Sequence, residues 1–392
     1  MKNIIVIFGA KSTEHDISVI TASQVLSALD RSKYNVIPVY IDTNGIWWTG
    51  KNLFDIKFFT QSSKKGLKEV AIFPSSQFLF KKQFGVFKRY KKIDCAIVSC
   101  HGKNGEDGTV QGLLELSNIP YSSAGVLASA VGLDKVKMKQ LFAYFGFPQS
   151  KFFAINKNKY DVAGIDLVLE NLDFPLIVKP SELGSSIGIS ICKTSEELKD
   201  ALDLAFMFDD EVVVEKLIEN LKEVNIAVLG NENECECSMT EQPNSNGKML
   251  TFEKKYIGSS NKKLGKKVDA KAKDNCGTKN GMQNLDRIMP AQISKKEQSQ
   301  IETLARQIFV NLKLKGVVRM DFMIDTKQKQ IYINEINTIP GSFAYYLWND
   351  KYSFSQLLDK IVDYALDSYK GEQKLLLTFK SNVLSGNFKT KK

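Results

Sequence analysis

The sequence predicts an α/β protein that begins with an open parallel sheet and continues, from about residue 170, with shorter paired strands. Two observations predict this fold class. Continuous β-branched and aromatic runs, such as IIVIF at residues 4–8, are typical of strands buried on both faces, and they alternate with helical segments. The later strands are joined by short polar or glycine-rich turns. A length of 392 residues fits two or three globular domains.

The N-terminal part follows a strand–helix alternation. The predicted strands are 4–8, 36–40 and 93–100, and the predicted helices are 16–28, 109–117, 124–131 and one that Asp134 caps and that ends near Gly146. Both histidines, His15 and His101, lie in polar loops that follow predicted strands. Ligands bind at this edge of open α/β sheets, so these loops are candidates for a binding crevice.

From about residue 170 the chain is predicted to contain strands joined by short turns, with helices between them. The predicted strands of this part are 176–180, 187–192, 211–216, 223–230, 316–325 and 330–337, and its predicted helices are 195–206 with Ser195 as N-cap, 294–312 and 354–369. Residues 258–287 are poor in apolar side chains and are not expected to hold packed structure. Residues after about 371 form an extension without assignment.

Composition and charge argue against several classes of protein, namely nucleic-acid-binding, membrane-spanning and secreted proteins. The net charge is 54 − 44 = +10, and Lys254 to Lys279 contributes +7 from nine Lys and two Asp. Tyr256 is the one aromatic residue in that run, so a solvated loop is favoured over a nucleic-acid surface. No apolar run approaches the roughly 20 residues of a membrane-spanning helix, and the N-terminus lacks the pattern of a signal peptide. We therefore expect a cytoplasmic protein with reduced cysteines and with neither nucleic acid nor membrane as a partner.

The strongest pattern is the last predicted hairpin. Residues two apart in a strand share a face, so Arg319 lies beside Asp321, and Glu335 lies beside Asn337. If the strands pair about Gln328, Asp321 lies directly opposite Glu335. Two facing carboxylates are unfavourable unless a cation lies between them. Their oxygens suit Mg²⁺, but a salt-bridged surface hairpin would show the same pattern.

Other motifs are weaker alone. The Gly/Ser turn at 181–188 can aim backbone N–H groups at a phosphate, and Lys179, at the end of an apolar strand, needs an anionic partner. The Gly9–Ser12 segment imitates a P-loop but lacks its first glycine, and no G-x-G-x-x-G occurs. A zinc site built on the two histidines matches no known ligand spacing.

Six segments in one order resemble a known family: FGAKSTEHDIS, HGKNGEDGTVQGLLELSNIPYSSAGVLASAVGLDK, IVKPSELGSSIGI, EK followed by EVNIAVLG, RMDF and NEINTIPG. Together they resemble the D-alanine–D-alanine ligases, enzymes of the ATP-grasp fold, up to about residue 370. The resemblance implies a Rossmann-like domain at 1–133, a central ATP-grasp subdomain at 134–214 and a C-terminal ATP-grasp subdomain at 215–370. The last of these contains the lysine-rich loop 253–287, and 371–392 is the extension.

The resemblance also implies roles for individual residues. The residues implied to bind two Mg²⁺, or alternatively Mn²⁺, are Asp321, Glu335 and Asn337. ATP binding falls to Lys135, Lys179, Ser185, Glu215, Lys216, Leu217, Glu223 and Lys255. Substrate binding falls to Glu14, His101, Ser186, Gly341, Tyr346 and Leu347. Catalysis falls to Glu14, Ser185, Arg319 and Tyr256, and Lys255-Tyr256 would close over the nucleotide.

The expected reaction joins two D-alanines through a D-alanyl phosphate, for peptidoglycan synthesis. One departure concerns the second substrate, because Tyr346 stands where the family typically places a serine. A D-alanine–D-serine ligase or a ligase for another acceptor is therefore an alternative. A non-catalytic nucleotide-binding protein and a basic nucleic-acid binder are more remote alternatives. The sequence leaves a homodimer open.

Overall fold

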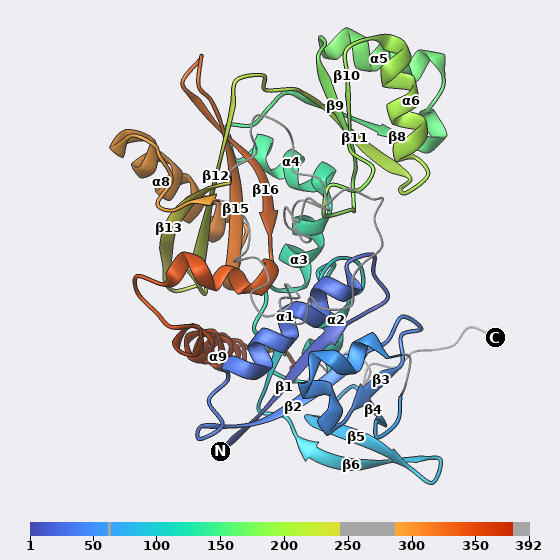
Figure 1. The fold of residues 1–392 in the computed structure, drawn as a ribbon, viewed down its shortest axis with the longest axis vertical. Helices are drawn as coiled ribbons and strands as arrows, with labels where there is room; N and C mark the ends of the chain where they lie inside the picture. Colours follow the sequence, from blue (N-terminus) through green and yellow to red (C-terminus); the bar gives the residue numbers. More distant parts are fainter. Residues whose placement is uncertain (62–63, 244–286, 379–392) are drawn as a thin grey trace, which may run out of the picture.

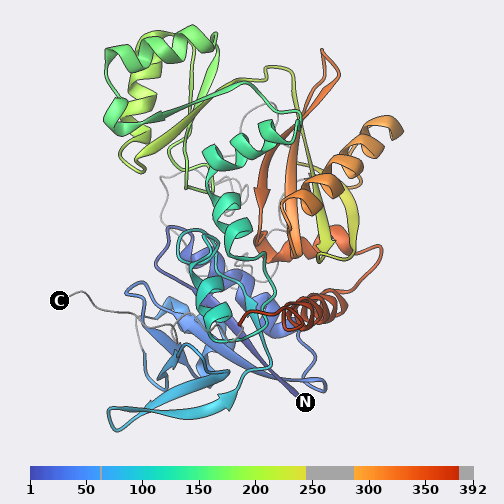
Figure 2. The ribbon, with the colours of Figure 1, turned by 180° about the vertical axis from the view of Figure 1, so that it is seen from behind.

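The computed structural model describes residues 1–61, 64–243 and 287–378, and these residues form three sheets (Figures 1 and 2). A seven-stranded sheet lies at one end and a four-stranded sheet at the other. A five-stranded sheet lies at the side, and helices α3 (Val126–Leu133) and α4 (Lys135–Tyr144) connect the parts. The mixed α/β class that the sequence predicts is confirmed.

The seven-stranded sheet contains the predicted parallel strands. β1 (Lys2–Gly9) lies between β2 (Tyr34–Ile41) and β7 (Cys95–Val98) and is parallel to both. Ile4 to Ile7 have no exposed surface, which accounts for their unbroken apolar run. Helices α1 (His15–Ala28) and α2 (Thr109–Leu116) follow β1 and β7, so the loops at the carboxyl ends of these two strands are neighbours.

The same sheet continues into four antiparallel strands that the sequence analysis did not predict. They are β3 (Trp47–Thr49), β4 (Lys68–Ile72), β5 (Phe78–Gln83) and β6 (Val86–Lys92), and the sheet order is β6-β5-β4-β3-β2-β1-β7. The sheet is therefore mixed and not wholly parallel. β6 has no fully buried residue and six of its seven are exposed, so it shows no apolar pattern. Two 3₁₀ turns, Lys51–Phe54 and Ile56–Thr60, precede β4.

The four-stranded sheet has the order β10-β9-β11-β8. Its strands are β8 (Phe152–Asn156), β9 (Leu176–Pro180), β10 (Ser190–Cys192) and β11 (Glu211–Lys216), with helices α5 (Val162–Asn171) and α6 (Ser195–Ala205) and a 3₁₀ turn at Lys157–Lys159. β8 and α5 were not predicted. The N-cap of α6 is Thr194 and not Ser195, because the Thr194 side chain accepts the Glu197 N–H. β11 extends two residues beyond the division expected at 214.

The five-stranded sheet has one apolar face and one polar face. Its order is β14-β13-β12-β15-β16, with β12 (Leu221–Gly230), β13 (Cys235–Pro243), β14 (Arg287–Ile288), β15 (Gly316–Asp325) and β16 (Gln330–Asn337). Helix α8 (Lys295–Asn311) packs Ile301, Ala305 and Ile308 against the apolar face. Within α8, Ser294 and Glu297 form a capping box. The opposite face is left for polar side chains.

The chain then returns to the N-terminal sheet. A 3₁₀ segment, η5 (Gly341–Trp348), packs against α1, and helix α9 (Phe354–Glu372) packs against β7 and α1. Trp348 and Leu347 have no exposed surface and join the same core as β1. Among the described residues, no helix is long and apolar enough to cross a membrane. Five cysteines are free thiols, and Cys276 lies outside the described residues.

Candidate active site

The polar face of the five-stranded sheet carries a row of side chains across four strands. Glu241 on β13 pairs with Asn225 on β12, Asn225 pairs with Asp321 on β15, and Asp321 pairs with Glu335 on β16. Directly paired residues share a face, so the row holds three carboxylates and one amide. The predicted pairing of Asp321 with Glu335 and of Arg319 with Asn337 is confirmed.

The pairing register changes immediately beyond this row. Phe322 pairs with Ile333, so Asn334 is an extra residue in β16, a β-bulge. The hairpin therefore does not pair about Gln328 along its whole length, although the predicted register holds at the site. The side-chain amide oxygen of Asn334 lies 3.3 Å from the Nζ of Lys179. The bulge thus brings the C-terminal sheet into contact with the central one.

Arg319 neutralises part of the row. Its Nε and one Nη donate to the two oxygens of Asp321 at 2.7 and 2.8 Å, and the Asn337 amide donates to Asp321 at 3.2 Å. Burial opposes the charge of Arg319, but the Asp321 carboxylate outweighs it and raises the pKa of Arg319 well above its ordinary value. This bidentate pair orients the guanidinium along the polar face.

The donor set fits a hard divalent cation. Asp321, Glu335 and Asn337 offer oxygen ligands, and two of them are carboxylates in directly paired positions. Among the described residues no cluster of three or more His, Cys, Asp and Glu side chains could hold a metal alone. The remaining ligands would therefore come from water or from a bound phosphate, as is usual for Mg²⁺.

A buried ion-pair network lies between α4 and the central sheet. Glu215 contacts the Nζ of Lys139 at 2.9 Å and the Nζ of Lys179 at 2.8 Å, and the Ser150 hydroxyl donates to it at 2.7 Å. Burial alone would raise the pKa of Glu215, but the two ammonium groups outweigh it and lower it to about 2. Lys139 and Ser150 were not predicted, since neither belongs to a recognisable motif.

The other residues predicted to bind the nucleotide make the following contacts. The Nζ of Lys135 donates to the carbonyl of Leu183 at 2.6 Å, and burial lowers the pKa of Lys135. Lys216 donates to the carbonyls of Asp173 and Phe174, and the backbone N–H of Leu217 donates to Pro175. Glu223 is partly exposed on β12.

Glu14 lies at the meeting point of the N-terminal and central parts. It precedes α1, it is 7% exposed, and the Ser185 hydroxyl donates to its carboxylate. A Cβ on Gly102 would lie 2.9 Å from this carboxylate and a Cβ on Gly184 would lie 2.7 Å from it, so both glycines allow its close approach. Ser186, next to Ser185, shares the left-handed conformation of that residue.

A second buried network joins α1 and the loop after β7 to the segment after β16. The Thr21 hydroxyl accepts the Ser342 N–H at 3.2 Å and lies 2.9 Å from Nε2 of His101. Burial lowers the pKa of His101 to about 4. Glu106 accepts the N–H groups of Gly102 and Ile339 at 2.8 and 2.9 Å.

The backbone of this segment has unusual geometry. Ser342, Phe343 and Ala344 all have left-handed dihedrals, with φ of 55°, 52° and 47°, directly after Gly341. Each such non-glycine residue costs about 1–2 kcal/mol. The Thr21 contact with Ser342 and the burial of Phe343 and Ala344 hold this conformation in place.

Tyr346 belongs to a third network, next to the row of carboxylates. Its hydroxyl donates to Glu241 at 3.0 Å, and the guanidinium of Arg287 lies 4.1 Å from its ring centre. Arg287 also donates to Glu241 at 2.7 Å, and the Asn225 amide donates to it at 3.0 Å. Tyr346 is 2% exposed and Leu347 is fully buried. Glu241 and Arg287 were not predicted.

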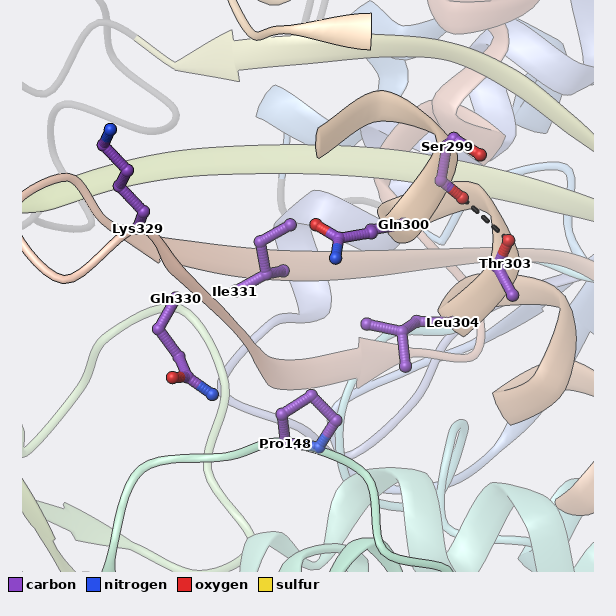
Figure 3. Close-up of a pocket in the computed structure, with 8 residues that line it drawn as sticks. All are labelled: Pro148, Ser299, Gln300, Thr303, Leu304, Lys329, Gln330 and Ile331. Carbon is purple, nitrogen blue, oxygen red and sulfur yellow. Dashed lines mark hydrogen bonds between the residues drawn. The ribbon is translucent and has the colours of Figure 1, made fainter. Parts of the chain in front are cut away.

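Two predicted site residues, Lys255 and Tyr256, lie outside the described residues, as does most of the lysine-rich loop 253–287. A pocket of about 530 Å³ lies elsewhere, between Pro148, the α8 residues Ser299, Thr303 and Leu304, and the β15–β16 turn (Figure 3). It is lined by Ile331, which belongs to the apolar face under α8, so it lies across the sheet from Asp321 and Glu335. None of the predicted site residues lines it.

Comparison with known proteins places this geometry in a family. A model described as the D-ala D-ala ligase N-terminus matches residues 3–124, and one described as the D-ala D-ala ligase C-terminus matches residues 141–280 and 275–363. A D-alanine–D-alanine ligase from Thermosipho africanus is 36% identical, with 98% of each chain covered. One from Staphylococcus epidermidis is 37% identical, with 95% of this chain and 97% of the relative covered.

Solved structures with a similar fold belong to the same group of ligases. The D-alanine–D-alanine ligase from Coxiella burnetii matches with a TM-score of 0.77 at 26% identity, covering 96% of this chain and 97% of that one. The VanG D-Ala:D-Ser ligase from Enterococcus faecalis matches with a TM-score of 0.74 at 28% identity, covering 93% and 99%. From its matched domains and its full-length relatives, the chain belongs to the D-alanine–D-alanine ligase family.

Proposed function

We propose that the protein is an ATP-dependent ligase that joins two D-alanines into D-alanyl-D-alanine. The observation that carries this proposal is the row on the polar face, in which Asp321 pairs with Glu335 while Arg319 and Asn337 bind Asp321. The Nζ of Lys179 contacts Asn334, the residue before Glu335 on β16, so a positive charge that can bind phosphate lies beside the metal-binding set. Full-length similarity to ligases of this name supports the same conclusion.

Phosphoryl transfer requires positive charge around the transferred group. The carboxylate of the first D-alanine attacks the γ-phosphorus of ATP, ADP leaves, and an acyl phosphate forms. Two Mg²⁺, or Mn²⁺, held by Asp321, Glu335 and Asn337, would neutralise phosphate charge. Lys135, Lys179 and Arg319 would stabilise the charge that spreads over the phosphoryl oxygens.

The adenine end would lie along β11. Here the Glu215 side chain is committed to Lys139 and Lys179, so its part in nucleotide binding is to orient Lys179. The adenine edge would then be read by backbone groups at Lys216 and Leu217, with Glu223 on the ribose.

The first D-alanine would bind at Glu14. A carboxylate that is 7% exposed, beside two glycines, suits a small ammonium group better than a bulky one. Ser185 holds this carboxylate in place. His101 stays neutral in this setting, because burial lowers its pKa to about 4.

The second amino acid would approach the acyl phosphate from the side of Gly341 and Tyr346. Its amine attacks the carbonyl carbon, phosphate leaves, and the amine loses a proton. Tyr346 fills space where a serine would leave room, so a small acceptor is expected. D-alanine is the first candidate. D-serine is the second, because the VanG D-Ala:D-Ser ligase is among the similar structures.

One assay tests the proposal. Phosphate release from ATP is measured with Mg²⁺ and D-alanine alone, and then with D-alanine plus D-serine or D-lactate as competing acceptor, and the products are separated. We expect phosphate release with D-alanine alone and D-alanyl-D-alanine as the main product. Turnover that requires D-serine would support the second candidate, and ATP turnover independent of any D-amino acid would contradict both.

A further inference from the structure

The hairpin of β5 and β6, residues 78–92, has features that ligase chemistry does not require. We call it the basic hairpin. It contains Lys81, Lys82, Lys88, Arg89, Lys91 and Lys92 and no Asp or Glu, which gives 6 − 0 = +6 over 15 residues. It forms the outer edge of the seven-stranded sheet, at the end of the molecule away from the central subdomain (Figure 1).

The tip of the basic hairpin is apolar and exposed. Gln83 pairs with Val86, so Phe84 and Gly85 form a two-residue turn, with φ of 49° and 81°. Phe84 is 103% exposed and Val86 is 60% exposed. Two-residue turns of this type favour Asn-Gly or Asp-Gly, so a phenylalanine in this position is costly to the fold and to solubility.

The positive charges behind the tip lie close enough to repel each other. Lys81 lies directly opposite Lys88, and like charges in directly paired positions destabilise a hairpin. Lys82 is partly compensated by Glu69 at 2.8 Å, and Lys81 by the ring of Tyr90 at 4.1 Å. An external anion bound beside these lysines would relieve the remaining repulsion.

Two ordinary explanations account for only part of this pattern. Lysines on an edge strand prevent edge-to-edge aggregation, but an exposed Phe-Gly-Val tip works against that purpose. Single-stranded nucleic acid would need open aromatic faces. Here Phe80 and Phe87 both pack against Phe73, and Arg89 covers Phe78 at 5.1 Å. Phe84, at the tip, is the most exposed aromatic residue of the hairpin.

We propose that the basic hairpin docks the protein on an anionic lipid bilayer. Phe84 and Val86 enter the headgroup region, and the lysines and arginine behind them face the lipid phosphates. An apolar tip framed by basic residues gains both from burial of apolar surface and from the negative surface potential. The sequence predicts no membrane partner because it has no apolar run long enough to span a membrane, and a short hairpin with an apolar tip lacks that pattern.

This docking surface is separate from the candidate active site. The site loops follow β1 and β7, whereas β5 and β6 occupy the opposite edge of the same sheet, beyond β2, β3 and β4. Substitutions at exposed hairpin positions therefore leave ligase activity unchanged.

Vesicle co-sedimentation of the full chain tests the proposal. We expect at least about tenfold stronger binding to vesicles of equal parts phosphatidylglycerol and phosphatidylcholine than to phosphatidylcholine alone. The double variant Phe84→Ser/Val86→Ser, and separately the triple variant Lys88→Gln/Lys91→Gln/Lys92→Gln, should each weaken binding at least about tenfold. Equal binding to both vesicle types, or wild-type binding by the Phe84→Ser/Val86→Ser variant, would overturn the proposal.

Matched variants control for loss of charge and of apolar surface elsewhere. Lys295→Gln/Lys296→Gln/Lys327→Gln removes three exposed lysines from the α8 side, and Met207→Ser removes a side chain that is 78% exposed. Both should bind vesicles as the wild type does. If these controls weaken binding as much as the hairpin variants, the association is general electrostatics and the proposal fails.

Direct insertion is read from fluorescence. In Phe84→Trp, the emission, after subtraction of wild-type emission, should shift to the blue with anionic vesicles and not with phosphatidylcholine. An unchanged emission would contradict insertion of the tip. Displacement from vesicles by a single-stranded oligonucleotide that binds the Phe84→Ser/Val86→Ser variant equally well would assign the surface to nucleic acid instead.

Discussion

At the scale of single residues, the candidate site shows which side chains the sequence could identify. Asp321, Glu335, Arg319 and Asn337 were predictable because alternation along a strand fixes the shared face and a hairpin fixes the pairing. Lys139 was not predictable, since a lysine in the middle of a helix shows no sign that its ammonium group is buried against Glu215. Burial of polar groups is a tertiary property, which local pattern does not record.

Glu335→Ala removes one of the two facing carboxylates. We expect the turnover number to fall at least about 100-fold at saturating Mg²⁺, since a charge-stabilising contact to the transferring group is lost. The melting temperature should stay close to that of the wild type, because Glu335 is only partly buried. Gln330→Ala, an exposed position on the same strand, is the control. Activity near that of the wild type would exclude Glu335 as a metal ligand.

Tyr346→Phe tests the acceptor side. The variant loses the hydroxyl that donates to Glu241, and an unmade buried hydrogen bond costs about 1–3 kcal/mol. If that hydroxyl also serves the acceptor, the KM for the second D-alanine should rise more than the KM for ATP. A lower melting temperature with an unchanged acceptor KM would make Tyr346 a packing residue, and Ser342 would be tested next.

The buried His101 predicts a pH dependence of stability. Its pKa is about 4 in the folded protein and about 6.5 in an unfolded chain, so between these values the unfolded state binds more protons. Its contribution is therefore complete above pH 6.5 and is lost as the pH falls toward 4. His101→Gln should make the fall of melting temperature over this range less steep. An equally steep fall in the variant would show that other groups carry the effect.

At the scale of elements, the hairpin β15–β16 and the loop at 181–188 show the limit of prediction. The hairpin and its register at the site were predicted, but the bulge at Asn334 was not. One extra residue shifts the buried apolar positions from Ile331 and Ile333 to Ile336, and a single shift of this kind in a short strand does not by itself identify a bulge. The basic hairpin was missed because consecutive lysines and arginines interrupt the apolar–polar alternation by which a strand is recognised. The glycine loop was located, but its contact with Glu14 requires the folded chain.

Gly184→Ala tests that loop. The added Cβ would lie 2.7 Å from the Glu14 carboxylate, so the carboxylate or the loop must move. We expect a higher KM for the first D-alanine with little change in melting temperature. Gly112→Ala, whose Cβ would meet nothing closer than 3.9 Å, is the control and should leave all constants unchanged. Identical KM values for the two variants would separate Gly184 from donor binding.

At the scale of the whole molecule, three parts of the chain contribute residues to one candidate site, and the contacts between these parts are polar. Glu14 meets Ser185, Lys179 meets Asn334, and Thr21 meets Ser342. The sequence predicted the order of the parts from the six segments it shares with the family. It could not predict these contacts, because each connects residues more than 150 positions apart.

Thr21→Val tests the contact between α1 and η5. Valine keeps the shape but leaves the Ser342 N–H without its acceptor and removes the hydroxyl that hydrogen-bonds to Nε2 of His101. We expect a loss of about 1–3 kcal/mol in stability and a lower turnover number. Thr21→Ser, which keeps the hydroxyl, should retain both. If Thr21→Ser loses as much activity as Thr21→Val, the methyl group and not the hydrogen bonds matters.

The contacts of Glu106 with Ile339 and of Thr21 with Ser342 span 233 and 321 positions of the chain. Loop closure of that size is slow and comes late in folding. The left-handed turn at 342–344 therefore forms only after both ends of the chain have met. During refolding from denaturant, nucleotide binding should return before peptide-bond formation. The interval between the two measures how long the turn at 342–344 takes to form its contact with Thr21.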